Sequence, residues 1–302
     1  MYEDHRWPRG CCKAGEIKMN RQPGCLAENS VGLGLRSVHI ERILQQQPDV
    51  PWFEVLMDNH TAQGGLIPGQ LAAVREHYPL SLHCVGMSLG GVNPLDMRYL
   101  ETVKRMMHDY TPVQISDHLC FTHHGSHHFN DLLPFPFTSE SLDHVSGRID
   151  RVQDYLGRSI LVENVSTYLQ FESSEMNEAE FMKALVDRTG CGILLDINNA
   201  YVNQFNHGFS AKAFIDTIPI DHVGEVHLAG FEDKTDYLID AHNNRVCDAV
   251  WELFEYYLQF GHSAPVLIEW DNDIPGLDVL LDEAARARQI ILRSSETVTR
   301  YA

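Results

Sequence analysis

Several His, Asp, Glu and Asn residues stand where short apolar runs of the sequence end, and a buried strand can deliver polar side chains to a shared site from that position. The run at 192–199, GILLDINN, stops abruptly in one carboxylate and two carboxamides. Burying an unpaired charge or amide costs about 2 kcal/mol or more, so Asp196, Asn198 and Asn199 need partners. Seven other apolar runs occur, and most of the later ones end in the same residue types.

The residues at or just after these run ends share one chemistry, because all of them can bind a metal. The candidate ligands are His83, His118, Glu163, Asp196, Asn199, His227, Asp240, His242 and Glu269. Several carboxylates cannot gather without a cation that offsets their repulsion, and imidazoles with bridging carboxylates suit two or three divalent ions such as Zn, Mn or Fe. We therefore expect a multinuclear metal site.

Each of these residues also has a plainer explanation when it is taken singly. A lone His in an apolar strand, such as His83, is more often a hydrogen-bonded core residue. Glu163 and Glu269 could each be half of a buried ion pair, and Asn198 and Asn199 could cap a turn. The metal interpretation is favoured because all the candidates fall at the same end of consecutive strands and their loops.

Eight apolar runs, each a predicted strand, carry or precede these residues and alternate mainly with helical segments. The runs lie at residues 31–36, 51–60, 80–86, 112–121, 159–166, 192–199, 222–230 and 264–273. Asn177 with Glu180 three residues later predicts the start of a helix, and Gly190 predicts its end. This alternation is typical of an α/β fold of the (β/α)8 TIM-barrel type, in which the active site lies at the C-terminal ends of the strands.

Length and charge narrow the possible classes of protein. The chain has 302 residues, 44% of them hydrophobic, and we expect a single barrel domain at 31–302 after a poorly ordered extension at 1–30. A net charge of −19 argues against binding to nucleic acid or to an anionic membrane surface. The sequence lacks an apolar run of 18 residues and an apolar secretory segment at its start, so we expect a cytoplasmic protein.

Cysteines and a histidine-rich loop offer further candidate sites. The seven cysteines include no CxxC pair, which fits reduced thiols, and Cys11, Cys12 and Cys25 fall in the predicted extension. The loop at 123–128 carries four histidines and looks like a metal cluster, but it has no evident scaffold. We expect both segments to stay outside the metal site.

A set of motifs in chain order resembles a known family. These motifs are FEVLMDN, LHCVGMSLGG, SDHL, LVENVSTYL, LLDINNAYVNQFNHG, VHLAG and LIEWD. They resemble the multinuclear non-heme iron oxygenases, once a family of unknown function, which include the iron oxygenase of methanobactin biosynthesis and relatives that modify cysteines in ribosomally made peptides. The resemblance covers about residues 31–292, and SLGG, SDHL and DINNAYVN are specific in combination.

The resemblance implies the cofactors and partners. It implies two or three iron ions, cycling between Fe2+ and Fe3+, with O2 as co-substrate. It also implies a Cys-containing precursor peptide whose thiolate binds one iron, and a separate recognition protein that presents the peptide. Glu163 stands at the centre of the ligand order, so we expect it to bridge two metals.

The same barrel end is similar to the trinuclear zinc endonucleases that cut DNA at abasic sites and to the xylose isomerases. Where the endonuclease pattern has a second His three residues after its Asp, this chain has Asn199, a harder oxygen ligand that suits iron better than zinc. Relatives commonly carry Glu-Asn where this chain has Asp58-Asn59. We expect these two residues, with Asn164 and Asn198, to act as catalytic residues beside the metals.

Two other classes of function remain open. One is a metal-dependent hydrolase or isomerase on the same ligand frame, and the other is a non-catalytic metal-binding protein. Metal analysis separates the three, because iron with O2 consumption favours the oxygenase, zinc with phosphatase activity the hydrolase, and metal without turnover the binding protein.

Overall fold

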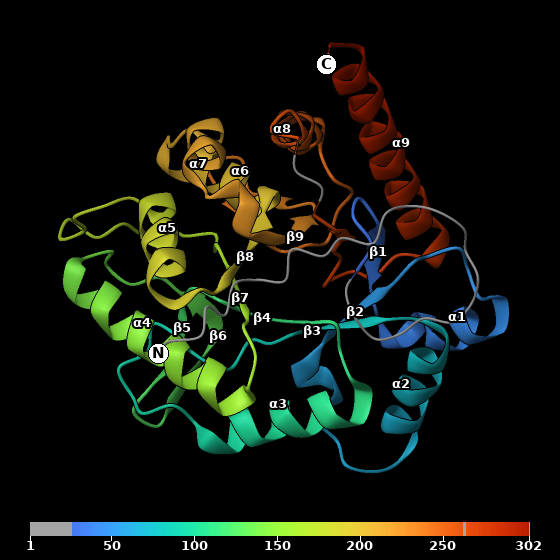
Figure 1. The fold of residues 1–302 in the computed structure, drawn as a ribbon, viewed down its shortest axis with the longest axis horizontal. Helices are drawn as coiled ribbons and strands as arrows, with labels where there is room; N and C mark the ends of the chain where they lie inside the picture. The colour runs from blue at the N-terminus through green and yellow to red at the C-terminus, as the bar shows by residue number, and fades with distance from the viewer. Residues whose placement is uncertain (1–25, 262–263, 302) are drawn as a thin grey trace, which may run out of the picture.

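The computed structural model describes residues 26–261 and 264–301, and in this part of the chain eight parallel strands close into a barrel (Figure 1). The barrel strands are β1 (Val31–Gly34), β2 (Phe53–Leu56), β3 (Leu80–His83), β4 (Gln114–His118), β7 (Leu161–Glu163), β8 (Gly192–Asp196), β9 (Val223–Leu228) and β12 (Val266–Ile268). Each falls within one of the eight predicted runs. The TIM-barrel prediction is therefore confirmed.

Helices surround the barrel on its outside, as Figure 1 shows. They are α1 (Ile40–Gln46), α2 (Leu66–His77), α3 (Met97–Tyr110), α4 (Ser139–Leu156), α5 (Glu178–Thr189), α6 (Ile197–His207), α7 (Ala211–Thr217), α8 (Asp248–Leu258) and α9 (Leu277–Tyr301). The predicted capping of α5 is confirmed, because Asn177 and Glu180 exchange side chain-to-backbone hydrogen bonds and Gly190 ends the helix in the left-handed conformation. No helix in the described part of the chain is long and apolar enough to cross a membrane.

The strand register brings candidate ligands into neighbouring positions. His118 on β4 is the cross-strand partner of Glu163 on β7, and Asp196 on β8 is the partner of His227 on β9. Because all eight strands run parallel, these pairs lie at the same, C-terminal, end of the barrel.

The barrel interior is polar beneath this level as well. Ser81 donates a hydrogen bond to Glu54 (2.9 Å) and Gln114 donates one to Glu225 (2.7 Å), across the inside of the barrel. A small apolar cluster contains the fully buried Trp52 and Leu267. The barrel interior thus carries polar side chains at two levels, one of which holds the candidate ligands, where a TIM barrel usually has an apolar filling.

The structure differs from the sequence prediction at the histidine-rich segment and at the end of the run 192–199. The histidine-rich segment is not a loop but an antiparallel hairpin of β5 (Phe121–His124) and β6 (His127–Leu133), because Gly125 adopts the left-handed conformation (φ 59°) that its tight turn requires. Asn198 and Asn199 do not lie at a strand end, since α6 begins directly after β8. Asp196 caps that helix by accepting a hydrogen bond from the backbone N–H of Asn199 (2.7 Å).

One more ribbon follows β9. Strands β10 (Glu232–Asp233) and β11 (Leu238–Ile239) form a short antiparallel ribbon just before Asp240. Of the predicted N-terminal extension at 1–30, residues 1–25 lie outside the described residues, and with them Cys11, Cys12 and Cys25.

Gly230 gives the first test of how the fold holds the site. A Cβ atom at Gly230 would lie 2.2 Å from the backbone oxygen of Asn244 and 2.5 Å from that of Arg245, just beyond the loop that carries Asp240 and His242. We therefore expect Gly230→Ala to lower the free energy of unfolding by about 1–3 kcal/mol. Gly147→Ala is the control, because Gly147 is exposed in α4 with open space around it, and alanine there should stabilise the helix by up to about 1 kcal/mol. Chemical denaturation of both variants checks this, and equal stabilities would contradict it.

Candidate metal centre

Side chains from seven strands or strand ends and one loop converge in a single buried cluster at the C-terminal end of the barrel. The cluster contains four overlapping groups of ligand atoms, each group within 4.8 Å: His83, His118 and Glu163; Glu54, His227 and Glu269; Glu163, Asp196 and His227; Asp196, His242 and Glu269. All of these residues are buried. Because the groups share Glu163, Asp196, His227 and Glu269, they form one continuous cluster with room for more than one ion.

The first group has the geometry of ligands around one ion. His83 Nε2 lies 3.1 Å from His118 Nε2 and 3.4 Å from Glu163 Oε2, and His118 Nε2 lies 3.3 Å from the same oxygen. Ligand atoms held about 2.1 Å from one metal at octahedral or tetrahedral angles stand about 3.0–3.4 Å apart. Ser116 Oγ lies 2.7 Å from His83 Nδ1, so it fixes the imidazole with Nε2 directed at the group.

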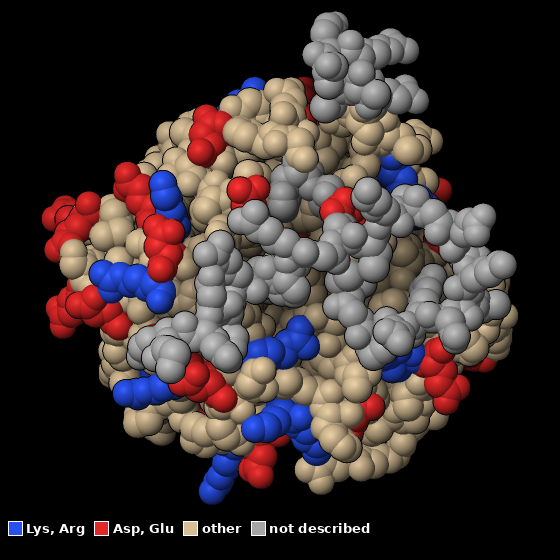
Figure 2. Space-filling view, in the orientation of Figure 1, with Lys and Arg blue, Asp and Glu red and all other residues tan. Residues whose placement is uncertain are grey.

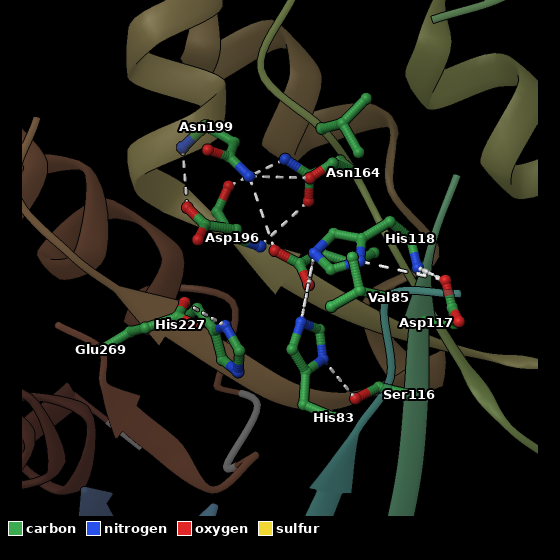
Figure 3. Close-up of polar contacts among 12 residues, drawn as sticks. His83, Val85, Ser116, Asp117, His118, Asn164, Asp196, Asn199, His227 and Glu269 are labelled. Carbon is green, nitrogen blue, oxygen red and sulfur yellow. Dashed lines mark hydrogen bonds and ion pairs between the residues drawn. The ribbon is translucent and has the colours of Figure 1, made fainter. Parts of the chain in front are cut away.

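The opposite side of the cluster is built from β8, β9, β12 and the loop after β11. In Figure 3 the rings of His83 and His118 point toward each other, while Asp196, His227 and Glu269 approach from this opposite side. His227 Nδ1 lies 2.9 Å from Glu269 Oε2. The two sides therefore face one another across the end of the barrel.

His242 joins this side from the loop. Its Nε2 atom lies 2.5 Å from Asp240 Oδ1 and 3.9 Å from Asp196 Oδ2. Its Nδ1 atom lies 2.9 Å from Asp271 Oδ2, and Asp271 is in turn paired with Arg36. The Arg36–Asp271 pair thus orients the imidazole of His242, as a carboxylate commonly does for a metal-binding histidine.

Many polar atoms of the cluster have no hydrogen-bond partner. They include His118 Nδ1, Glu163 Oε2, Asp196 Oδ2, Asn198 Oδ1, Asn199 Oδ1, both ring nitrogens of His227, and His242 Nε2. Several of these atoms stand at ion-pair distance from a neighbour, as above, yet none of them meets hydrogen-bond geometry. Buried polar atoms are almost always satisfied, so a set of this size and chemistry fits metal ions that complete it.

Burial dominates the protonation of the cluster. It raises the pKa of Asp196 to about 7 and that of Glu163 well above its usual range, and it lowers the pKa values of His83 and His118. This half of the cluster is therefore held close to neutral. A divalent cation would favour the deprotonated carboxylates, so metal binding should release protons.

The other half of the cluster is ionic. Burial alone would lower the pKa values of His227 and His242, but the carboxylates beside them, Glu269 and Glu54 at His227 and Asp240 and Glu269 at His242, raise both well above the usual value. Burial would likewise raise the pKa of Glu269, but the same two histidines hold it well below its usual range. Before any metal binds, these charges compensate one another.

The structure brings together all nine sequence-predicted ligands. Seven belong to the four groups: His83, His118, Glu163, Asp196, His227, His242 and Glu269. Of the other two, Asp240 contacts His242, and the Asn199 amide nitrogen lies 3.5 Å from Glu163 Oε1.

The four residues predicted to be catalytic take different places. Asn164 exchanges two 2.9 Å hydrogen bonds with the backbone of Asp196, so its side chain holds the end of β8 against β7. Asn198 donates to Asp240 Oδ1 (2.9 Å). Asp58 and Asn59 are exposed and lie outside the four groups. Asp58 accepts hydrogen bonds from the backbone N–H of Val85 and the hydroxyl of Tyr99.

Sequence reasoning missed two buried carboxylates. Glu54 Oε1 and Glu225 Oε1 lie 3.3 Å and 3.4 Å from His227 Nε2, on the side of the ring away from Glu269. Burial and the neighbouring Glu54 carboxylate raise the pKa of Glu225 to about 8. The sequence could have indicated Glu225, because it precedes His227 by two residues. Successive residues of a strand alternate between its faces, so these two side chains lie on the same face.

The histidine-rich hairpin is separate from these groups. His123 pairs with His128 and His124 with His127 across its two strands, and the rings of His123 and His128 stand 5.4 Å apart. Among the described residues, the four groups with metal-binding geometry include none of these histidines.

Known sequences are similar to this chain over most of its length. Residues 30–292 match the family model described as RiPP precursor modification enzyme MbnB/TglH/ChrH. A UPF0276 protein from Acaryochloris marina is 46% identical over 261 residues, which cover 86% of this chain and 94% of that protein. Another from Paraburkholderia phytofirmans is 42% identical over 280 residues, which cover 89% and 91%.

Solved structures with the same fold are more distant. L-ribulose 3-epimerase superposes with a TM-score of 0.59 at 13% identity, over 90% of this chain and 98% of its own. Endonuclease IV from Thermus thermophilus superposes with a TM-score of 0.55 at 14% identity, over 89% and 99%. These similarities show the fold alone, a TIM barrel of the xylose isomerase and endonuclease IV type.

The unpaired buried atoms lead to a prediction about stability. Adding Fe2+ or Mn2+ to chelator-treated protein should raise the Tm by about 5 °C or more, because a ligand that binds only the folded state stabilises it. In Asp196→Asn this rise should shrink, while the Tm of the metal-free variant should match or exceed that of the metal-free wild type, since a buried carboxyl becomes a neutral amide. Differential scanning calorimetry measures the Tm of both proteins with and without metal. If the wild-type Tm did not change when metal was added, the metal centre would be refuted.

A second prediction concerns the histidine-rich hairpin. Replacing His123, His124, His127 and His128 together by Ser should leave the metal content near the wild-type value, because the strand ends already supply the ligands. Elemental analysis by mass spectrometry measures this. A large loss of metal would instead place the hairpin in the centre.

Proposed function

Because this chain belongs to the MbnB/TglH/ChrH family of RiPP precursor modification enzymes, we propose that it is a multinuclear iron oxygenase that uses O2 to modify cysteine residues of a ribosomally made precursor peptide. The observation that supports this most strongly is the buried cluster of four overlapping ligand groups. A cluster of this size exceeds what one ion needs and suits two or three.

The ligand chemistry favours iron. The cluster offers imidazole nitrogens, carboxylate oxygens and the Asn199 amide oxygen, a set that suits iron, whereas thiolates would favour zinc or copper. None of the cysteines in the described residues belongs to the four groups, and Cys84, Cys120 and Cys191 are buried elsewhere. Bound iron would supply the electrons for O2 reduction, which zinc cannot supply.

Within this proposal, side chains of the protein bind the metal ions or orient the residues that bind them. Glu163 belongs to two of the four groups and is the proposed bridge between metals. Ser116 and Asp271 each engage the Nδ1 atom of a histidine and turn its Nε2 atom toward the cluster. Asn164 keeps Asp196 in register, and Asn198 steadies Asp240 on the loop.

The substrate cysteine has to reach the cluster from the C-terminal face of the barrel, where Asp58 and Asn59 are exposed. We assign these two residues to contacts with the peptide. A separate recognition protein would present the peptide, as the resemblance to the cysteine-modifying oxygenases implies.

Iron content and oxygen uptake test the proposal together. Protein purified and reconstituted with Fe2+ under anaerobic conditions should hold more than one iron per chain and should consume O2 only with a Cys-containing peptide. A peptide with Ser in place of Cys is the matched control. Zinc with phosphatase activity, or stable metal without turnover, would replace the oxygenase by a hydrolase or by a binding protein.

Loop variants sharpen this test. Asp240→Ala or His242→Ala should lose about one metal per chain and the oxygen uptake, because removal of even an outer partner of a ligand lowers metal affinity about 10- to 100-fold. The sites built on β3, β4 and β7 should keep their metal. His123→Ser on the hairpin is the control and should keep both properties. Full iron and full uptake in the Asp240 and His242 variants would remove the loop from the centre.

A further inference from the structure

A separate pocket of about 580 Å³ opens beside the metal centre. Three segments line it: residues 134–137 before α4, residues 167–180 between β7 and the first turn of α5, and residues 200–217 of α6 and α7. The first two segments lie in the connections that leave the C-terminal ends of β4 and β7, and the third runs from the first turn of α6 to the last residue of α7. The pocket therefore belongs to the same face of the barrel as the metal centre.

The pocket combines apolar walls with acidic groups. Its apolar lining consists mainly of Phe135, Phe137, Leu169, Phe171, Met176, Phe209 and Phe214. Glu175, Glu178 and Glu180 are the charged residues that line it, and the lining, drawn from the described residues, includes no Lys, Arg or His. Its chemistry is that of a site for an apolar side chain beside a positive charge.

The three glutamates are held in place by backbone groups. Glu178 accepts a hydrogen bond from the N–H of Val165 (3.1 Å), and Glu180 accepts one from the N–H of Asn177 (2.9 Å). Glu175 accepts hydrogen bonds from both the N–H and the hydroxyl of Ser139. In the described residues these carboxylates have no basic side chain as an ion-pair partner. The exposed Glu175 and Glu180 are therefore free to attract a cation, whereas burial raises the pKa of Glu178 to about 8 and favours its neutral form.

One stretch of chain separates the pocket from the metal centre. Thr167 lines the pocket and donates to Asn203 (2.8 Å), while the adjacent Ser166 donates to Asp240 (3.1 Å) in the centre. Asn203 lies about one helical turn beyond Asn199 along α6. The near edge of the pocket therefore lies about one helical turn, about 6 Å, from the centre. A few residues of extended peptide would span both sites.

Exposed side chains connect the two sites. Tyr168 accepts a hydrogen bond from the backbone N–H of Asp240 (3.0 Å), and the next residue, Leu169, lines the pocket. Tyr168 is 42% exposed and Leu169 is 49% exposed. They offer an apolar surface along which a bound peptide can run from one site to the other.

Charge on the surrounding surface is mixed and includes many acidic groups. Figure 2 shows Asp and Glu side chains at the edge of the molecule where α5 and the loop before it lie, with some Lys and Arg side chains among them. In that loop and the first turn of α5, Glu172, Glu175 and Glu180 are exposed. A basic peptide segment would be drawn to this edge.

We propose that this pocket is a subsite for the precursor peptide, in which a bulky apolar side chain next to a Lys or Arg binds about three residues from the cysteine at the metal centre. The inference rests on the proposed function, because it takes the substrate to be a peptide. It adds a sequence requirement to that peptide which the metal centre alone does not impose.

Labelled synthetic peptides test the subsite on the metal-loaded, full-length protein. Each twelve-residue probe carries one Cys, and a Phe-Lys pair is placed two, three, four or five residues before or after it. Probes with Phe-Glu or Ser-Ser in place of Phe-Lys are the controls. Fluorescence anisotropy under anaerobic conditions should show the tightest binding for a Phe-Lys probe at one spacing near three, and equal binding of all probes would overturn the subsite.

Two exposed phenylalanines provide matched variants. Phe209 is 53% exposed and lines the pocket, whereas Phe205 is 48% exposed and does not. Phe209→Ala should weaken binding of the best Phe-Lys probe about tenfold and leave the Ser-Ser probe unchanged, and Phe205→Ala should change neither. Ala213→Trp, which fills the pocket from an exposed position, should act like Phe209→Ala, with Lys212→Trp as its control.

Separate readouts keep the two proposals distinguishable. Iron content should stay at the wild-type value in all four variants, since none of these residues contacts the cluster. If oxygen uptake depended on the Cys but probe binding did not depend on the Phe-Lys pair, the subsite would be rejected and the oxygenase proposal kept. Pocket-dependent binding without any oxygen uptake would reject the oxygenase chemistry and keep a peptide subsite.

Discussion

Repulsion among buried carboxylates is the constraint on which the rest of this structure depends. Glu163, Asp196 and Glu269 are carried on separate strands to one end of the barrel, where water cannot screen them. Imidazoles offset part of this repulsion on the β9 and β12 side, and protonation relieves it on the β7 and β8 side. Metal ions would resolve both halves at once, because they would bind the carboxylates as anions and the imidazoles through their free nitrogens.

The sequence revealed the strand ends of this site because parallel strands deliver their last residues to one face. All nine predicted ligands converge for that reason. Glu54 and Glu225 were missed because each lies inside an apolar run rather than at its end. At such a position, only the alternation of strand residues between the two faces indicates that a side chain points into the barrel. The sequence predicts a loop at 123–128 where the structure has a hairpin, because the strand pairing there depends on one glycine turn rather than on an apolar pattern.

The pocket beside the centre lay beyond sequence reasoning for a different reason. Its walls come from three segments that are far apart in the chain, and their apolar residues follow no single period. Only packing around the barrel brings Phe135, Leu169 and Phe214 together. Binding chemistry built from loops in this way varies without disturbing the strands beneath, which is why one barrel can support many substrates.

His242 occupies a backbone conformation that favours other residues. Its φ angle of 44° lies in the left-handed region, where Gly and Asn are comfortable and a bulkier side chain costs about 1 kcal/mol or more. Metal binding by its imidazole, which lies between Asp240 and Asp271, would offset this cost. In a lineage that had abandoned the metal, drift toward Gly or Asn at this position would be favoured by stability alone. The residue at position 242 would thus indicate whether a descendant of this fold still depended on metal ions.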